Sequence, residues 1–327
     1  MTLDTHVDIP FDFATAEVDP ATADLQVNLD KMEAGGLDAA FFIVYVGQTA
    51  RTPENYAKAK ADAMTKFEAI HRMTDELYPD RIGLAYRADD VPRLIAEGKL
   101  AAAIGIENGY VIGKDLDLLD RYYELGARYM TLAHNGHNDI ADSAQPQDEL
   151  GDGPTEHDGV SEFGAAVIRR MNELGIMVDI SHGSKQTALD AMELSVAPVI
   201  ASHSSARAVT DHARNLDDET LLRLRDNGGV VQVVAFNPYL TAEPPAKVAD
   251  LVDHIDHIVE LIGIDHVGIS SDFGGGGGIE GWNDALETPQ VTAELVRRGY
   301  SAEDIDRIWS GNLLRVWREV ERVAASL

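Results

Sequence analysis

Short apolar runs alternate with amphipathic stretches along the whole chain of 327 residues. Eight runs have the length and residue types of strands, and most of the stretches between them repeat apolar residues at helical spacing. The expected strands cover residues 3–8, 39–46, 101–106, 128–134, 177–182, 199–203, 230–236 and 267–272. The expected helices cover residues 21–34, 54–77, 116–125, 162–174, 185–194, 217–226, 247–262 and 302–323. Eight strands that alternate with helices are typical of a (β/α)8 barrel of the TIM type.

No segment divides this pattern into separate units. Residues 81–86 and 88–96 read as an insertion before the third strand, but no linker rich in Pro, Gly or Ser interrupts the chain. No internal repeat of fixed period is visible. We therefore predict an α/β fold in which residues 1–327 form a single barrel domain.

Polar residues that bind metals follow the expected strands. They are His6, Asp8, Glu107, His182, His203 and Asp272. All of them lie at the carboxyl end of a strand, which is the face where barrels carry their active sites. A doubly wound open sheet would gather such residues mainly at one switch point. Contributions from the first, third, fifth, sixth and eighth strands favour a closed barrel.

These residue types indicate a metal-dependent hydrolase. His6 and Asp8 are two residues apart on a strand, so their side chains share a face. The chain has no cysteine, so any metal must be held by His, Asp and Glu. The number of ligands suggests two ions, with His6 and Asp8 on the first, His182 and His203 on the second, and Glu107 bridging. Two ions roughly 3.5–4 Å apart can share a hydroxide and polarise a substrate carbonyl. We expect zinc first, with manganese or cobalt as alternatives.

Asp272 ends the eighth expected strand. A carboxylate there can move a proton from the attacking water to a leaving amine. The alternative is a carboxylate that only orients a ligand histidine. We favour the catalytic role.

Net charge restricts the classes of partner. The chain carries 56 acidic and 27 basic side chains, a net charge of −29 at pH 7. Nucleic acids and anionic membranes would be repelled. The longest apolar runs, 37–46 and 230–236, are too short to span a bilayer, and no secretory leader is visible. We expect a soluble cytoplasmic protein with no membrane or nucleic-acid partner; a homodimer is compatible with the sequence.

Two loops and several further histidines have weaker signals. Residues 274–278 are five glycines, for which we favour backbone clearance beside a site over a phosphate-binding role. The polar loop 135–159 is a candidate partial lid and contains His137 and His157. His254 and His257 share a helix face, and surface or packing roles are expected for both.

In combination, the motifs of the chain resemble the renal (membrane) dipeptidase family of the amidohydrolase superfamily. The resemblance covers nearly the whole length. It rests on Asp4-Thr5-His6-Val7-Asp8, Glu107-Asn108-Gly109, Asp179-Ile180-Ser181-His182, Ser202-His203-Ser204-Ser205, Arg214-Asn215, residues 271–275 and residues 311–316. Asn108 departs from the family pattern, which has glycine after the glutamate.

The resemblance implies a binuclear zinc dipeptidase on a distorted barrel. By motif position, the metal ligands would be His6, Asp8, Glu107, His182 and His203. His134 matches the family histidine that steadies the oxyanion, and Arg214 matches the arginine that holds the terminal carboxylate of the substrate. Tyr45 matches a tyrosine of the substrate pocket. The stereochemistry of the second residue is left open, so dipeptides with a C-terminal D-residue fall within the expected substrates.

Other functions remain as alternatives. A lactonase, a deaminase or a phosphotriesterase would use a similar barrel. Phosphotriesterase-like enzymes bridge their metals with a modified lysine on the fourth strand, and residues 128–134 contain no lysine. Deaminases usually bind one metal, whereas Glu107 suggests two. A barrel that only binds ligands should have lost Asp272 or a metal ligand, and none is missing.

Overall fold

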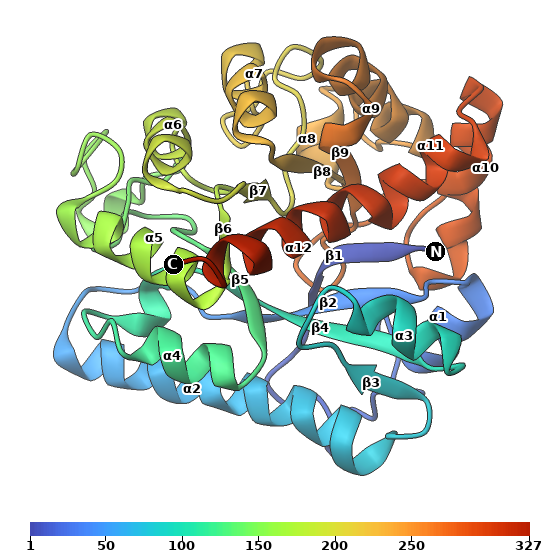
Figure 1. Ribbon diagram of the computed structural model, residues 1–327, viewed down its shortest axis with the longest axis horizontal. Helices are drawn as coiled ribbons and strands as arrows, with labels where there is room; N and C mark the ends of the chain where they lie inside the picture. Colours follow the sequence, from blue (N-terminus) through green and yellow to red (C-terminus); the bar gives the residue numbers. More distant parts are fainter.

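Parallel strands form a nearly closed barrel in the computed structural model, which describes residues 1–327 (Figure 1). Neighbouring strands follow the order β1-β2-β4-β5-β6-β7-β8-β9. Their bounds are β1 Leu3–Asp8, β2 Ala39–Tyr45, β4 Leu100–Glu107, β5 Ala127–Thr131, β6 Met177–Asp179, β7 Ile200–Ala201, β8 Val230–Val234 and β9 Val267–Ser270. The chain after β9 returns to β1, where the Asp8 amide donates to the Phe273 carbonyl at 2.7 Å. The predicted (β/α)8 fold is confirmed.

Helices surround the barrel and follow the strands in turn. They are α1 Leu29–Gly35, α2 Pro53–His71, α4 Leu118–Glu124, α5 Glu162–Leu174, α6 Lys185–Leu194, α7 Asp218–Asn227, α8 Asn237–Leu240, α9 Val248–Ile262, α10 Thr288–Arg298, α11 Ala302–Asp306 and α12 Asn312–Ala324. The predicted insertion forms β3 (Ile82–Leu84) and α3 (Asp90–Ala96). Strand β3 pairs with the first three residues of β4.

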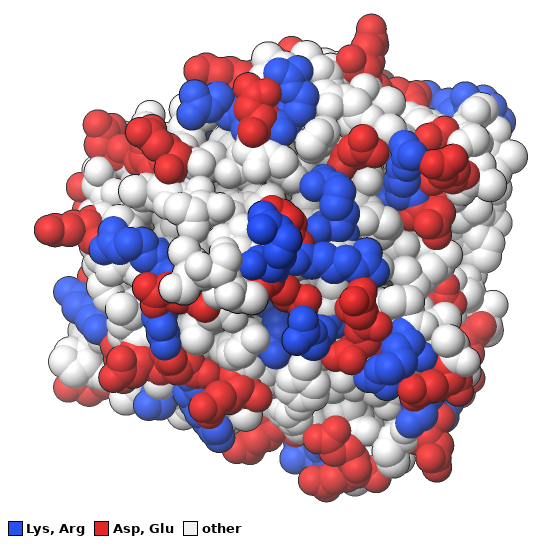
Figure 2. Space-filling view, viewed as in Figure 1, with Lys and Arg blue, Asp and Glu red and all other residues white.

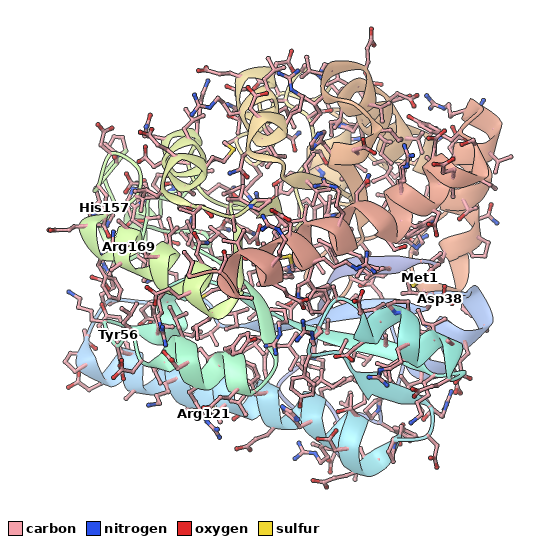
Figure 3. All side chains as sticks on the ribbon, in the orientation of Figure 1. Met1, Asp38, Tyr56, Arg121, His157 and Arg169 are labelled. Atoms are coloured by element: carbon pink, nitrogen blue, oxygen red, sulfur yellow. The ribbon has the colours of Figure 1, made fainter.

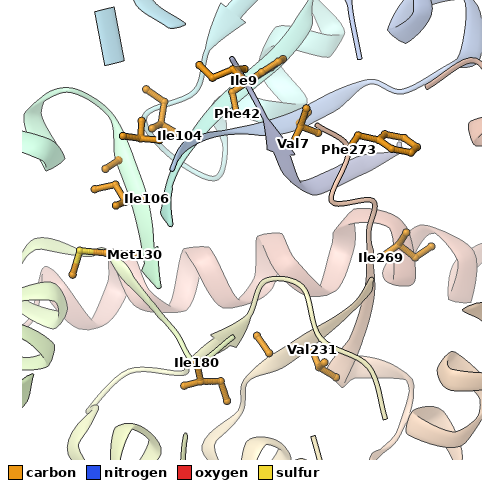
Figure 4. Packing of buried hydrophobic residues seen from close by; sticks show 14 of the residues in the cluster. Val7, Ile9, Phe42, Ile104, Ile106, Met130, Ile180, Val231, Ile269 and Phe273 are labelled. Atoms are coloured by element: carbon orange, nitrogen blue, oxygen red, sulfur yellow. The ribbon is translucent and has the colours of Figure 1, made fainter. Parts of the chain in front are cut away.

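Side chains of each strand alternate between two apolar clusters. On β2, Phe41 and Ile43 belong to a cluster of 20 buried residues inside the barrel, whereas Phe42 and Val44 belong to a cluster of 72 between strands and helices. Figure 4 shows members of the outer cluster, among them Phe42 on β2 and Ile104 on the neighbouring strand β4. The period of two along a strand therefore builds two cores from one sheet.

Helix α12 crosses one end of the barrel (Figure 1). Its residues Leu313, Trp317 and Val320 share the inner cluster with residues at the starts of the strands. The Trp317 ring lies 5.5 Å from the Phe41 ring, and Phe41 lies 5.2 Å from Tyr129. The amino-terminal end of the barrel is therefore filled with packed side chains, and only the opposite end is left for a site.

The helices of the structure differ in several places from those expected from the sequence. The helix predicted at 21–34 begins only at Leu29, because the Asn28 side chain caps it by accepting from the Lys31 amide and holds the preceding loop through Ala23. The helix predicted at 302–323 is interrupted by a π-helical turn, Arg307–Gly311. Helix α10, which follows the glycine run, was not expected from the sequence, although proline in its first turn is a helix-start signal.

Charges of both signs are interspersed on the face shown in Figure 2. The chain start is tied down beside the sheet, where the Thr2 amide donates to Asp38 Oδ2 at 2.9 Å and Met1 and Asp38 lie close together (Figure 3). None of the helices combines the length and the apolar character that crossing a bilayer requires.

Candidate metal centre and active site

A cavity of about 460 Å³ opens at the carboxyl ends of the strands. Seven of the predicted site residues line it: Asp8, Tyr45, Glu107, His134, His182, His203 and Asp272. His6 lies fully buried just beneath them, with its Nε2 atom 3.6 Å from Asp8 Oδ2. Residues from seven different strand ends therefore converge on one cavity, as the strand-end positions predict.

Glu107 lies at the centre of this cluster, and its two oxygens face different partners. Oε2 lies 3.5 Å from His6 Nε2. Oε1 lies 3.1 Å from His182 Nε2 and 3.3 Å from His203 Nε2. A carboxylate with one oxygen toward each group of ligands can bridge two cations.

The imidazoles of the cluster are held by hydrogen bonds at Nδ1, which leave Nε2 directed toward Glu107. Tyr129 Oη donates to the Thr5 carbonyl, so it accepts from His6 Nδ1, which lies 2.8 Å away. Ser202 Oγ donates to Asp179, so it accepts from His203 Nδ1 at 2.8 Å. With Nδ1 carrying the proton, the lone pair on Nε2 is left for a metal.

His182 follows the same arrangement, because its Nδ1 atom lies 3.1 Å from Asn135 Oδ1. Its Nε2 atom lies only 2.9 Å from His203 Nε2. Two lone pairs that face each other at this distance repel unless a cation or a proton lies between them. The donor set therefore fits a divalent metal ion. Burial lowers the pKa of both histidines well below the usual range, which keeps them neutral.

The positions of His6 and Asp8 also favour a cation. Burial alone would lower the pKa of His6, but the carboxylates of Glu107, Asp8 and Asp272 raise it to about 10. Burial, together with Glu107, raises the pKa of Asp8 to about 7. His6 Nε2 and Asp8 Oδ1 are buried without a hydrogen-bond partner. Unpartnered donors and acceptors in a buried cluster are costly, and a metal ion would satisfy them.

Asp272 lies at the rim of the same cluster. Its Oδ1 atom is 4.0 Å from His6 Nε2, and burial raises the pKa of its carboxyl group well above the usual range. It is 8% exposed and lines the cavity, so it faces both the histidine cluster and the cavity space. A carboxyl group with a raised pKa can exchange a proton near neutral pH.

The regular strands end two or three residues before several site residues. Buried carboxylates take over the backbone hydrogen bonds there: Asp179 Oδ1 accepts from the amides of Ser181 and Ser202, and Asp4 Oδ1 accepts from those of His6 and Ser271. His182 and Asp272 adopt positive φ angles of 63° and 59°. The predicted strands that ran to residues 182, 203 and 272 are therefore too long.

His134 and Tyr45 line the wall beside the cluster. His134 Nε2 lies 3.7 Å from Glu107 Oε1, and the Tyr45 ring is 4.8 Å from the His134 ring. Burial lowers the pKa of His134, and burial raises the pKa of Tyr45 to about 12. Both side chains are therefore neutral and can donate hydrogen bonds to a ligand.

Arg214 lies near the cluster but does not line the main cavity. It is 2% exposed, and Nη2 donates to the His203 carbonyl at 3.2 Å. Its side chain borders a second cavity of about 220 Å³. No carboxylate pairs with it, and Nε is buried without a partner. A buried guanidinium with free donor capacity can bind an anionic group.

Lys66 is a cavity residue that the sequence analysis missed. It lies on α2, is 4% exposed and lines the main cavity. Burial lowers the pKa of Lys66, whereas the carboxylates of Asp8 and Glu107 act in the opposite direction. A lysine on an amphipathic helix carries no sequence signal of burial, so only the structure could place it.

The glycine run gives the clearance that the sequence predicted. A Cβ atom on Gly275 would lie 2.4 Å from Asp8 Oδ2 and 2.5 Å from Asp272 Oδ1. Asn108, where the family pattern has glycine, has a φ of 81°. Its side chain accepts from the Tyr110 amide and donates to the Val46 carbonyl. These two hydrogen bonds anchor the Asn108 side chain directly after Glu107.

The remaining histidines lie outside the cavity. His137 and His157 lie in the loop 135–159, of which only Asn135 contributes to the cavity wall. Asp142 holds that loop by accepting from the amides of Glu156 and His157. His254 is fully buried, in agreement with the expected packing role.

Comparisons with known proteins agree with this geometry. A family model described as membrane dipeptidase (peptidase family M19) matches residues 1–327. Dipeptidase tcpJ of Claviceps purpurea is 38% identical over 325 residues, which are 97% of this chain and 75% of that protein. Dipeptidase aclJ of Aspergillus oryzae is 36% identical over 310 residues, 92% of this chain and 72% of that protein. The chain belongs to the membrane dipeptidase family.

Solved structures extend the likeness to the whole fold. The structure of the probable dipeptidase PvdM from Pseudomonas aeruginosa is 32% identical, with a TM-score of 0.95 over 99% of this chain and 96% of that one. A metallo peptidase from Rhodobacter sphaeroides, liganded with a phosphinate mimic of the dipeptide L-Ala-D-Ala, shares the fold at 24% identity, with a TM-score of 0.84 over 98% of this chain and 99% of that one. The predicted metal-dependent dipeptidase is confirmed over the lactonase and deaminase alternatives.

Proposed function

We propose that the cluster holds two divalent metal ions, with zinc as the expected metal, on His6, Asp8, Glu107, His182 and His203. The observation that carries this proposal is the position of Glu107, with one oxygen toward His6 and the other toward the two remaining histidines. When bound, such ions polarise the scissile carbonyl and activate water for attack at neutral pH.

The substrate is a dipeptide, including those with a C-terminal D-residue, held by groups around the cluster. Arg214 binds its terminal carboxylate; the supporting observation is a buried guanidinium without any acidic partner. His134 donates to the carbonyl oxygen as negative charge develops on it, and Tyr45 forms part of the wall. Asp272 takes the proton of the attacking water and delivers it to the leaving amine.

The metal content of the protein tests the proposed two-metal centre. Protein purified without chelator should contain close to two ions per chain, measured by elemental analysis, and should return to two after metal removal and zinc addition. Asp272→Asn should keep both ions and lose about 10²–10⁴-fold in kcat, because proton transfer needs the carboxylate. One ion per chain even in excess zinc would contradict the bridged centre.

Variants of Arg214 and of the substrate test the proposed binding of the terminal carboxylate. Arg214→Ala should lower kcat/KM for L-Ala-L-Ala and L-Ala-D-Ala by about one to two orders of magnitude, because a charge-assisted contact contributes roughly 1.5–3 kcal/mol. Amidation of the substrate carboxylate should cost the wild type as much and the variant little. Arg207→Ala is the matched control, since Arg207 lies on the same segment and pairs with Asp211 at 3.3 Å. Equal cleavage of amide and free acid by the wild type would exclude carboxylate recognition.

A further inference from the structure

Lys66 is a buried cation with no carboxylate within ion-pair distance. Its ammonium group takes part in no hydrogen bond and no ion pair, although the side chain is only 4% exposed. The nearest defined contacts are two aromatic rings, with Nζ 5.0 Å from the Phe11 centroid and 5.6 Å from the Tyr45 centroid. Cation–π contacts compensate only part of the charge, and the side chain lines the cavity that a ligand would occupy. The cavity therefore presents a charge that a ligand can neutralise.

Lys66 and Arg214 lie on opposite sides of the metal cluster. Lys66 packs on Tyr45 at the end of β2, and Arg214 binds the His203 carbonyl just after β7. In the order of the barrel, three strands separate β2 from β7 in one direction (β4, β5, β6) and three in the other (β1, β9, β8). A short peptide whose scissile bond lies over the cluster therefore has one end toward each cation.

No acidic side chain lies within ion-pair distance of Lys66, and Asp62, one turn earlier on α2, pairs with Lys58 instead. The only acidic side chains that line the cavity are Asp8, Glu107 and Asp272, and all three face the histidine cluster. Ile9 and Pro10 add apolar surface to the cavity lining. A second carboxylate on the substrate, beyond the one at its C-terminus, would complement this wall in charge.

We propose that Lys66 binds a carboxylate on the side chain of the first residue, so that the enzyme prefers dipeptides that begin with Asp or Glu. The inference rests on the proposed function, because Arg214 at the terminal carboxylate is what directs the first residue toward Lys66. It assigns a substrate class to the site: dianionic dipeptides with an acidic N-terminal residue.

The experiment compares L-Glu-L-Ala, L-Gln-L-Ala and L-Ala-L-Ala as substrates of the metal-loaded wild type, Lys66→Met and Lys60→Met. Glutamine has the shape of glutamate without its charge. The wild type should prefer Glu-Ala over Gln-Ala by about 10- to 100-fold in kcat/KM, mainly through KM. Lys66→Met should remove this preference and leave cleavage of Ala-Ala within a few-fold. Lys60 lies exposed on the same helix, so Lys60→Met should behave as the wild type.

Each outcome separates this inference from the proposed function. If no dipeptide is cleaved, the proposed function itself fails. If Ala-Ala is cleaved but Glu-Ala and Gln-Ala are equal, the assignment of Lys66 is wrong. An equal loss on all three substrates in Lys66→Met would also overturn it, since Lys66 would then serve the cluster or the terminal carboxylate. Phosphinate mimics with a first residue of Glu or Gln give a second readout by inhibition of the wild type alone, and the Glu mimic should bind at least 10-fold tighter.

Discussion

Ser202 shows how one hydroxyl group can orient a proposed metal ligand, His203. It donates to Asp179 Oδ2 at 2.6 Å and therefore accepts from His203 Nδ1. Asp179 also accepts from the amides that follow β6 and β7, so a single carboxylate fixes two strand ends and, through Ser202, one imidazole. Such partners of a ligand histidine determine its tautomer and its direction.

Removal of that hydroxyl should weaken the centre without unfolding the protein. Ser202→Ala leaves His203 Nδ1 without its acceptor, so both tautomers become accessible. We expect metal affinity to fall by about 10- to 100-fold, measured by competition with a chelator. The unfolding temperature of the metal-free variant should stay close to that of the metal-free wild type. An unchanged affinity would show that His203 is oriented by its backbone alone.

Helix α9 shows how one element depends on a buried neutral side chain. His254 Nδ1 accepts from the Ala206 amide at 3.0 Å, and Nε2 donates to the Leu240 carbonyl at 3.1 Å. The helix is thereby tied to the segments that follow β7 and β8. A proton on Nδ1 would break the first bond, and burial lowers the pKa of His254 from 6.5 to about 4.

This pKa predicts how stability depends on pH. Between pH 6.5 and 4 the unfolded chain binds a proton at His254 that the folded chain does not, so the free energy of unfolding falls as the pH falls. The contribution is fully present above pH 6.5, and about 3 kcal/mol is lost by pH 4. Denaturant unfolding of the metal-free protein measures it, and His254→Gln should reduce the loss by that amount. Parallel pH profiles for wild type and variant would refute the assignment.

At the scale of the whole molecule, helix α12 closes the end of the barrel opposite the site. Trp317 is fully buried against Phe41, which packs on Tyr129. Tyr129 in turn accepts from His6 Nδ1. Aromatic packing at the closed end is therefore connected to His6, a proposed metal ligand, at the open end.

Truncation of this packing should destabilise the protein. Trp317→Ala should lower the free energy of unfolding by about 3–5 kcal/mol, because a large cavity is left between α12 and the strands. Arg322→Ala on the exposed face of α12 is the control, since the Arg322 side chain is 67% exposed. Denaturant titration measures the loss. A loss below about 1 kcal/mol would show that other residues close the barrel.

Much of the fold and of the site could be predicted from the sequence. The alternation of strand and helix patterns determined the barrel, because each parallel strand needs a crossover and two buried faces. His6, Asp8, Glu107, His182, His203 and Asp272 were predictable because the carboxyl ends of parallel strands must meet at one face. The exact ends of helices and strands were harder to predict. At these ends the side chains of Asn28, Asp4 and Asp179 accept backbone hydrogen bonds in place of the regular ladder.

The tertiary structure alone decided which charges are buried and which atoms face one another. Nothing in the sequence distinguishes Lys66 from Lys60, which lies on the same helix. In the structure, Lys66 packs against Phe11 and Tyr45 and is buried, whereas Lys60 is exposed. Contacts between strands far apart in sequence likewise decide which histidine each oxygen of Glu107 faces. They also decide the tautomers of the histidines around it. Local patterns determine which residues reach the barrel mouth, whereas long-range packing determines their directions and their protonation, and hence their chemistry.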